Sequence, residues 1–226
     1  MMQHVLRDGT NVKVRYLTRE DLPIIMQLQN IVLEDLIDKD RLEPLSKEEF
    51  LTILSGDKLM IGVFNQKTLI GFRAFLNPKN DEEGLGKDIG LLESEYPHIV
   101  YSEISNVHPD YRGNGLQTFM GKTWMDSLNR RDVRYILATV APFNIASLKD
   151  KFALGMRIYQ LKNKYGGKLR YIFCKDLQAN DNRVKEMKTI EMGDIQKQQQ
   201  YVNDGYVGVK MIQVKDTWYV EYVKYE

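Results

Sequence analysis

Cysteine is almost absent from this chain, which has one cysteine, Cys174, among 226 residues. The fold therefore does not depend on disulfide bonds, and Cys174 is expected to be a small buried hydrophobic residue in a reducing compartment. An excess of charge is also absent, because 32 basic side chains stand against 31 acidic ones and leave a net charge of +1. Without a dominant basic block to follow a phosphate backbone, nucleic acid is not expected to be a partner.

Long apolar runs are missing as well. No stretch approaches the roughly 18 apolar residues that a membrane-spanning helix needs, and Met1–Thr10 lacks the basic-then-apolar pattern of a signal peptide. We expect a soluble, cytoplasmic protein without a membrane partner. At 226 residues, the chain is long enough for one large domain with a real hydrophobic core.

Capping patterns mark two helices near the start of the chain. Thr18 and Asp21 have the spacing of an N-cap and its third-residue partner, and apolar residues at helical spacing follow them. Ser46 and Glu49 repeat this pattern before a shorter helix. Helical spacing predicts further helices over 116–128 and 145–154. β-rich runs predict strands at 12–16, 59–64, 67–76, 99–107, 134–140, 156–162 and 169–177.

Polar segments interrupt this pattern twice. Residues 77–97 form a long loop with an excess of acidic side chains, of the kind that is often functional. Residues 178–188 have the composition of a linker. A helix and a terminal hairpin are expected behind it, at 194–203 and 207–225. The sequence therefore predicts one domain over 1–177 and a linker with a small C-terminal extension over 178–226.

The strongest motif is VHPDYRGNGLQ at residues 107–117, between an expected strand and an expected helix. Its glycines, Gly113 and Gly115, let the main chain approach a ligand without a Cβ in the way. Successive N–H groups that lead into a helix N-terminus form a concave anion site suited to a pyrophosphate. Ordinary tight turns also place glycines before helices, so this motif alone leaves both interpretations open.

The spacing resembles the pyrophosphate loop of the GNAT superfamily of N-acetyltransferases, in which Arg or Gln is followed, after two residues, by Gly, one residue, and Gly or Ala. Arg112 and Gly115 match, whereas Gln117 occupies the small last position. The resemblance implies that backbone N–H groups of this loop hold the CoA pyrophosphate, and that the preceding strand pairs with the pantetheine arm. The CoA-binding residues that it implies are Asn106, Val107, Arg112, Gly113, Asn114, Gly115, Leu116 and Gln117.

A second block, TVAPFNIAS, begins at residue 139. In a helix, Asn144, Ser147 and Lys151 fall on one face beside a neighbouring apolar face. We expect the apolar face to pack and the polar face to be free for binding, with simple capping by Asn144 as the alternative. The block resembles the GNAT pattern Asn-x-x-Ser leading to Gly-Phe, with Met156 in place of the Phe. The resemblance implies that the three polar residues contact CoA.

Lys151 departs from the family pattern. Many members carry a Tyr there that protonates the departing CoA thiolate, whereas this chain offers a lysine that could meet a CoA phosphate or be solvated, and we favour solvation. The loss of the Tyr need not be fatal, because a thiol has a pKa of about 8.5 and its thiolate leaves readily.

Glu103 is the candidate for proton removal. It lies four residues before Val107, where a number of enzymes of this superfamily carry a Glu. An alkyl amine has a pKa of about 10.4, so a carboxylate that accepts its proton would help it to become a nucleophile. An exposed strand glutamate is the alternative, and the strand alternation does not decide between them. His108 and His98 are further candidates, although each fits a loop residue better than a base.

Residues 164–172, KYGGKLRYI, resemble one bacterial subgroup of these enzymes, although a tight Gly-Gly turn explains them without a ligand. The whole resemblance covers residues 12–177. It implies an α+β fold with a mixed, mostly antiparallel central sheet flanked by helices, plus the C-terminal helix and hairpin. A cofactor groove is expected where the strands 99–107 and 134–140 splay apart.

The implied reaction is direct attack of a primary amine on acetyl-CoA, without a metal. The acidic segment 81–95 lies where the resemblance puts an acceptor-binding insert, which favours a small cationic amine. Two alternatives stay open: a non-catalytic sensor or scaffold that binds acyl-CoA, and an acetyltransferase acting on protein N-termini or lysines. A homodimer is plausible by analogy alone.

Overall fold

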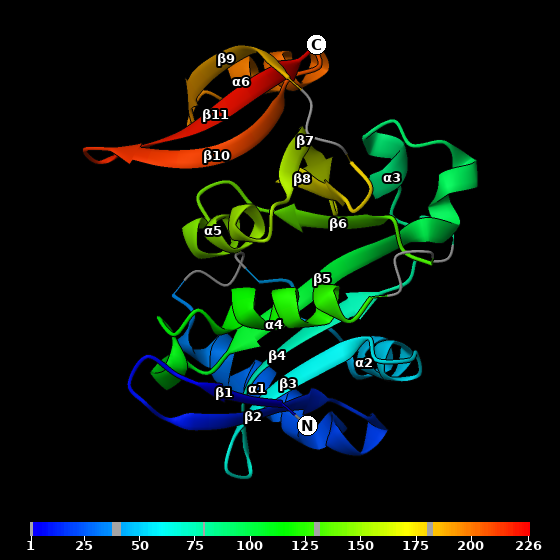
Figure 1. The fold of residues 1–226 in the computed structure, drawn as a ribbon, viewed down its shortest axis with the longest axis vertical. Coiled ribbons are helices and arrows are strands. Elements are labelled where there is room, and N and C mark those ends of the chain that lie inside the picture. Colours follow the sequence, from blue (N-terminus) through cyan, green and yellow to red (C-terminus); the bar gives the residue numbers. More distant parts are fainter. Residues whose placement is uncertain (1, 38–41, 79, 129–131, 180–182) are drawn as a thin grey trace. The chain divides into compact units, whose positions relative to one another are not determined.

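The computed structural model describes residues 2–37, 42–78, 80–128, 132–179 and 183–226 (Figure 1). The chain divides into two compact units, made of residues 1–76 with 102–128 and of residues 77–101 with 129–226. Strand β5 (Ile99–Val107) contributes its first three residues to the second unit and the remainder to the first. Each unit is therefore described by itself.

The first unit contains strands in the order β1-β2-β3-β4-β5. Its further strands are β1 (Met2–Val5), β2 (Asn11–Tyr16), β3 (Met60–Asn65) and β4 (Thr68–Leu76), and the pairs β1–β2, β2–β3 and β3–β4 are antiparallel. Its helices are α1 (Leu22–Asp35), α2 (Lys47–Leu54) and α4 (Leu116–Asp126).

The two faces of this sheet carry different helices. On one face, α4 contributes Leu116 and Met120 to a core that includes Val107 of β5. On the other face, α1 and α2 pack in a core that includes Ile104 of β5. Figure 1 shows α4 in front of these strands. Because side chains alternate along a strand, odd and even positions at the end of β5 serve opposite faces.

Local capping explains where the first helices begin. The Ser46 hydroxyl accepts the N–H of Glu49 at 3.2 Å, and the Glu49 carboxylate accepts the N–H of Ser46 at 2.7 Å. Both bonds satisfy donors that a helix N-terminus would otherwise leave open. The Asp21 carboxylate likewise accepts the N–H of Thr18 at 2.9 Å, and it also pairs with Arg15 at 2.7 Å. Ser46 is thus the N-cap of α2, as predicted, whereas Thr18 is the N-cap of a 3-10 helix, Arg19–Asp21, that leads into α1.

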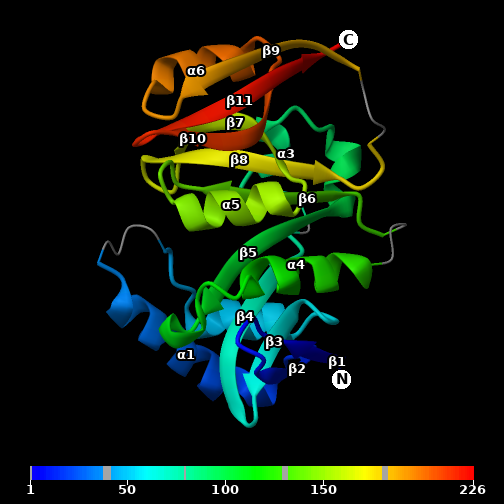
Figure 2. The same ribbon diagram turned by 60° about the vertical axis from the view of Figure 1, so that its left-hand side comes forward.

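The second unit extends from the start of β5 in the order β5-β6-β8-β7-β10-β11-β9 (Figure 2). Its further strands are β6 (Tyr135–Val140), β7 (Arg157–Lys164), β8 (Lys168–Asp176), β9 (Val184–Glu191), β10 (Val207–Val214) and β11 (Thr217–Tyr225). Its helices are α3 (Leu85–Asp88), α5 (Ile145–Ala153) and α6 (Ile195–Asn203). Only the short β5–β6 ladder is parallel among the described pairs.

Mixed, mostly antiparallel strands with flanking helices confirm the predicted α+β class. Three local expectations need correction. Strand β1 was not predicted, and the expected loop 77–97 contains α3 and a 3-10 helix at Glu93–His98. Part of the expected linker 178–188 is strand β9, which pairs with β11, and residues 180–182 of that linker lie outside the described residues. No helix in the described ranges is both long and apolar enough to span a membrane.

The C-terminal segment joins the sheet of the second unit through β10. Gly208 of β10 pairs with Ile158 of β7. A Cβ at Gly208 would lie 3.0 Å from the Ile158 Cβ and 3.2 Å from a ring carbon of Tyr222, so this close approach needs a glycine. The domain boundary at residue 177 stays a prediction.

Gln198 of α6 holds this segment together. Its side chain is fully buried, accepts hydrogen bonds from the hydroxyls of Tyr171 at 2.7 Å and Tyr222 at 3.0 Å, and donates to the Met192 carbonyl at 2.8 Å. Gln198→Ala would leave buried polar groups without partners, each costing about 1–3 kcal/mol. We expect it to lower the free energy of unfolding by about 2–4 kcal/mol, measured by urea denaturation.

Gln200→Ala is the matched control, because Gln200 is an exposed residue of the same helix. It should change stability by less than about 0.5 kcal/mol. Equal effects of the two changes would contradict the role assigned to Gln198.

Candidate active site

The glycine loop in the first unit has the backbone that its sequence predicts. Gly113 and Gly115 adopt φ angles of +80° and +73°, in the left-handed region that favours glycine. No atom lies within 4 Å of the position that a Cβ would take at either residue. Gly115 is the N-cap of α4, whose first N–H groups have no partners within the helix. The loop thus joins open space to a helix terminus that attracts anions.

Side chains of the loop are engaged within the first unit. The Asn114 amide accepts the N–H of Arg7 and donates to the Tyr111 carbonyl, both at 3.1 Å. The Tyr111 hydroxyl in turn accepts the amide N–H of Asn65 at 3.0 Å. These bonds fix the loop from its side chains, so its main chain is the part that a ligand would meet.

Arg112 is tied into the same unit. Its N–H donates to the Pro109 carbonyl at 3.2 Å, within a 3-10 turn. Its guanidinium forms an ion pair with Asp35 at the end of α1. The run of loop donors expected from Arg112 onward therefore effectively starts at Gly113, and any further part for Arg112 would come from its guanidinium.

Gln117 shows how the longer side chain is accommodated. Its side-chain amide N–H donates to the Ser105 carbonyl of β5 at 3.3 Å. The main-chain carbonyl of Gln117 accepts a hydrogen bond from the Arg73 guanidinium at 3.1 Å. Arg73 is fully buried in β4 and also donates to the Ser102 hydroxyl at 2.8 Å. Arg73 was not among the residues predicted from the sequence, although it is the single charged residue in the run TLIGFRAFL.

The end of β5 carries the remaining candidates of the first unit. Glu103 is half-buried, and Val107 packs against Leu116 and Met120 of α4. Asn106 is 1% exposed, and neither atom of its amide has a hydrogen-bond partner among the described residues. Glu103, Asn106 and Val107 therefore lie on one strand that leads directly into the glycine loop.

The two histidines are engaged in loop contacts. The Nδ1 atom of His108 lies 3.3 Å from the N–H of Asp110, which it caps, and its ring packs edge-on against Tyr111. The Nδ1 atom of His98, in the second unit, lies 3.3 Å from the Asp132 carbonyl. Both placements match the loop roles that the sequence favoured for them.

The second sequence block lies in the second unit, on α5. Asn144 is its N-cap, and its side-chain oxygen accepts the N–H of Ser147 at 3.3 Å. Capping, the alternative to binding, is thus present in the structure. The predicted apolar face packs inward: Leu148 is fully buried, and Phe152 contacts Phe173 edge-to-face.

The expectation that the Lys151 side chain is solvated was wrong. It is 7% exposed, and its ammonium lies 3.1 Å from the carboxylate of Asp150, which is 4% exposed. An isolated buried ammonium would be very costly, so its counter-ion is part of the fold. Neighbouring residues of a helix do not normally face each other, which is why the sequence did not predict this pair.

The candidate residues thus fall into two groups. The first unit holds Glu103, Asn106, Val107, Arg112, Gly113, Asn114, Gly115, Leu116 and Gln117, and the second holds Asn144, Ser147 and Lys151. Within each unit, the residues of a group lie on adjoining elements. The cofactor groove expected between the strands 99–107 and 134–140 stays a prediction.

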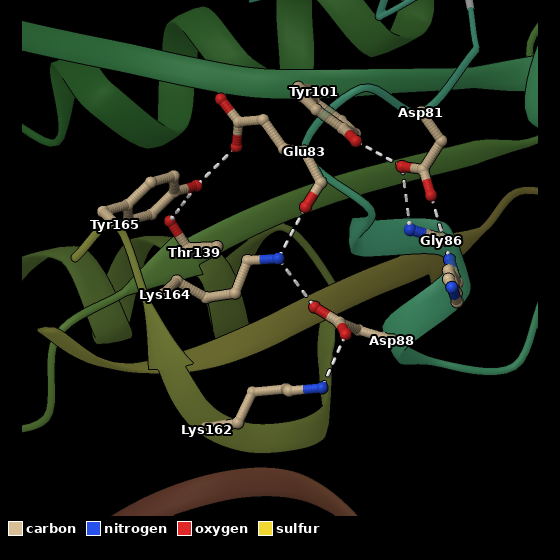
Figure 3. A network of polar contacts seen from close by, with 10 residues as sticks. Asp81, Glu83, Gly86, Asp88, Tyr101, Thr139, Lys162, Lys164 and Tyr165 are labelled. Atoms are coloured by element: carbon tan, nitrogen blue, oxygen red, sulfur yellow. Dashed lines mark hydrogen bonds and ion pairs between the residues drawn. The ribbon is translucent and has the colours of Figure 1, made fainter. Parts of the chain in front are cut away.

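The acidic insert, residues 81–95, is bound into the second unit (Figure 3). The Asp81 carboxylate is buried, accepts the N–H groups of Gly86 and Lys87 at 2.9 Å each, and accepts the Tyr101 hydroxyl. The Glu83 carboxylate accepts the Tyr165 hydroxyl at 2.6 Å. These two carboxylates therefore serve the shape of the insert.

Asp88 is the second anchor of the insert. Its two oxygens pair with the ammonium groups of Lys162 at 2.6 Å and Lys164 at 2.9 Å, both on β7 (Figure 3). Burial tends to raise the pKa of Asp88, but the two lysines outweigh it and hold this pKa below its usual value. Lys164 also donates to the Glu83 carbonyl at 2.5 Å.

Asp88→Asn should lower the free energy of unfolding by about 1–2 kcal/mol at pH 7, because it removes a charge-assisted contact with two ammonium groups. Since the folded state lowers the pKa of Asp88, this contribution is present above the unfolded pKa and is lost as pH falls through the folded one. Urea denaturation at pH 7 and pH 3 should show the two proteins converging in acid. A difference that is independent of pH would contradict the ion-pair explanation.

No cluster of three or more metal-ligating side chains is present in the part of the chain that the structure describes. Cys174 of β8 is 3% exposed, as predicted, and burial raises the pKa of its thiol.

No family model matches the sequence, and no curated protein matches it either. Solved structures do match. An acetyltransferase of the GNAT family from Listeria monocytogenes is 15% identical, with a TM-score of 0.57 over 78% of this chain and 100% of that one. The ribosomal-protein-S18-alanine N-acetyltransferase from Escherichia coli is 15% identical, with a TM-score of 0.55 over 77% of this chain and 99% of that one.

A third structure, yncA from Salmonella typhimurium, was solved with its cofactor acetyl-CoA. It is 15% identical to this chain, with a TM-score of 0.53 over 75% of this chain and 95% of that one. At these identities the likeness concerns the fold. This chain therefore has the fold of the GNAT N-acetyltransferases.

Proposed function

We propose that this chain is an acetyl-CoA-dependent N-acetyltransferase that transfers the acetyl group to a primary amine by direct attack. The observation that carries the proposal is the glycine loop. Gly113 and Gly115 have backbone angles that favour glycine and open space where a Cβ would be, directly before the N-terminus of α4. Such a loop suits a pyrophosphate. The fold shared with acetyltransferases supports the same assignment.

The proposed CoA contacts follow from this loop. The N–H groups from Gly113 to Gln117 would hold the pyrophosphate, with Arg112 at the loop's edge. The main chain of β5 at Asn106 and Val107 would pair with the pantetheine arm. Asn144, Ser147 and Lys151 are proposed as further CoA contacts from the second unit. For Lys151 this requires that its ammonium also serves Asp150.

In the proposed reaction, the acceptor nitrogen attacks the acetyl carbon and the C–S bond breaks. Acetyl-CoA supplies an activated thioester whose thiolate is a good leaving group. Glu103 would accept the proton that the amine loses, directly or through a water. N–H groups of the main chain near Val107 would polarise the acetyl carbonyl. The thiolate would then take a proton from solvent, so no tyrosine is needed at position 151.

The proposed acceptor is a small cationic amine. Its support is the acidic insert, in which Glu82 and Glu93 are exposed. Asp88 gives less support than the sequence suggested, because Lys162 and Lys164 already neutralise it.

Isothermal titration with acetyl-CoA, followed by measurement of thiol release with a panel of amines, tests the proposal. We expect micromolar binding and release of CoA with at least one amine. Binding without release across the panel would instead favour a non-catalytic acyl-CoA sensor. The absence of binding would overturn the assignment.

A further inference from the structure

The side-chain amide of Asn106 is buried and has no hydrogen-bond partner among the described residues. The side chain is 1% exposed, and neither its Nδ2 nor its Oδ1 atom has a hydrogen-bond partner among the described residues. Buried amides in folded proteins are almost always paired, because an unpaired one loses its bonds to water without replacement. A donor and an acceptor are therefore available at one point of β5, one residue before Val107.

The face of β5 on which Asn106 lies is fixed by its neighbours. Val107 packs in the core with Leu116 and Met120 of α4. Ile104 packs in the other core, with residues of α1 and α2. Because Asn106 is two residues from Ile104 and adjacent to Val107, strand alternation places it on the α1–α2 face.

Helix α4, which directly follows the glycine loop, packs on the opposite face of the strand. The proposed pyrophosphate site lies where Gly115 leads into α4, on the Val107 side of the strand. In a direct transfer, CoA and the amine must meet at the acetyl carbon from different sides. The Asn106 side chain is thus placed for the amine that arrives from the α1–α2 face.

We propose that the Asn106 amide binds the acceptor, by pairing with a group next to the amine that offers one donor and one acceptor, as an amide does. An amide fits because Nδ2 donates and Oδ1 accepts, so both unpaired atoms would be satisfied together. This inference rests on the proposed acetyltransferase function and names the acceptor chemistry that the site selects. Asn106 would be a specificity-determining residue, separate from Glu103, which the same alternation places on the Val107 face of β5 and which would therefore take the amine proton through a water.

The test compares three acceptors that share a primary amine: glycinamide, with an adjacent amide; ethanolamine, with a hydroxyl; and n-propylamine, with neither. The amide of glycinamide lowers the pKa of its amine, so kcat/KM is expressed per unprotonated amine for each acceptor. For the wild type, this value should be at least about 10-fold higher for glycinamide than for n-propylamine, since a site built for a polar group discriminates strongly against its absence. Asn106→Leu should reduce this ratio to about one, mainly through the KM for glycinamide. A preference for ethanolamine over glycinamide would overturn the amide assignment.

Stability supplies a readout that separates binding from a structural role. If the amide is unpaired in the folded chain, Asn106→Leu should leave the urea midpoint unchanged or raise it. A lower midpoint would show that the amide is bonded within the fold and would overturn the proposal. Ser105→Ala is the matched control, because it removes another buried, unpaired polar atom from the adjacent position on β5. It should leave the acceptor ratio unchanged.

The outcomes also separate this inference from the proposed function. If acetyl-CoA does not bind the wild type, the function itself fails. If acetyl-CoA binds and amines are acetylated, but Asn106→Leu lowers kcat/KM equally for all three amines and raises the KM for acetyl-CoA, the amide contacts CoA. In that case the inference fails and the function stands.

Discussion

The double substitution Gly113→Glu and Gly115→Glu is expected to lower the affinity for acetyl-CoA by more than about 100-fold while the chain stays folded. Two carboxylates would face the pyrophosphate at a few ångströms, where like charges repel by several kcal/mol at protein surfaces. Each glutamate also enters a left-handed backbone at a cost of about 1–2 kcal/mol. No neighbouring atom would clash, since none lies within 4 Å of either Cβ position. Isothermal titration measures the affinity, and circular dichroism measures the fold.

Gly205→Glu is the control for strain and charge. Gly205 has a φ angle of +83° and no atom within 4 Å of its Cβ position, but it follows α6 in the second unit. It should cost similar stability and leave acetyl-CoA affinity within about twofold. Wild-type affinity in the double variant would mean that this loop is an ordinary turn.

Glu103→Gln is expected to lower kcat about 100- to 1000-fold at pH 7, because a positioned base contributes about 10²–10⁴ to such reactions. The variant must rely on amine that is already deprotonated, and the pKa of an alkyl amine is about 10.4. Its deficit should therefore shrink as pH rises towards 10. Steady-state kinetics over pH 6–10 would show this slope.

The KM for acetyl-CoA should change little in this variant, since glutamine keeps the shape of the side chain. Glu48→Gln, an exposed change on α2 in the same unit, controls for the loss of one charge. A uniform loss at every pH would argue that Glu103 positions the substrate and does not accept its proton.

The elements predicted well from the sequence are those whose signals are local. Ser46 and Glu49 cap a helix through bonds that span only three residues, so the sequence pattern was sufficient. The turn at Tyr165–Gly167 was predicted for the same reason. Strand β9 was not predicted, because its exposed, charged residues have the composition of a linker and form a strand by pairing with the distant β11.

In the candidate site, too, the features set by local sequence were predicted and those set by distant contacts were not. The glycine loop was predicted because glycine itself sets the backbone angles there. The contacts of Arg73 with Gln117, and of Asp88 with β7, join residues 44 or more positions apart, and no short pattern reveals them. The prediction that Lys151 is solvated was wrong for a related reason, because the burial of a helix residue depends on which distant segments pack against α5.

The buried thiol of Cys174 makes the proposed chemistry convenient to follow. A disulfide reagent reacts with thiolates that it can reach, and this thiol is 3% exposed with a raised pKa. As the chain contains no other cysteine, a chromogenic thiol reagent added during turnover should report released CoA against a nearly blank protein background. The same property leaves the surface open to cysteines introduced one at a time, so a fluorophore could be attached near the glycine loop without first removing a native thiol.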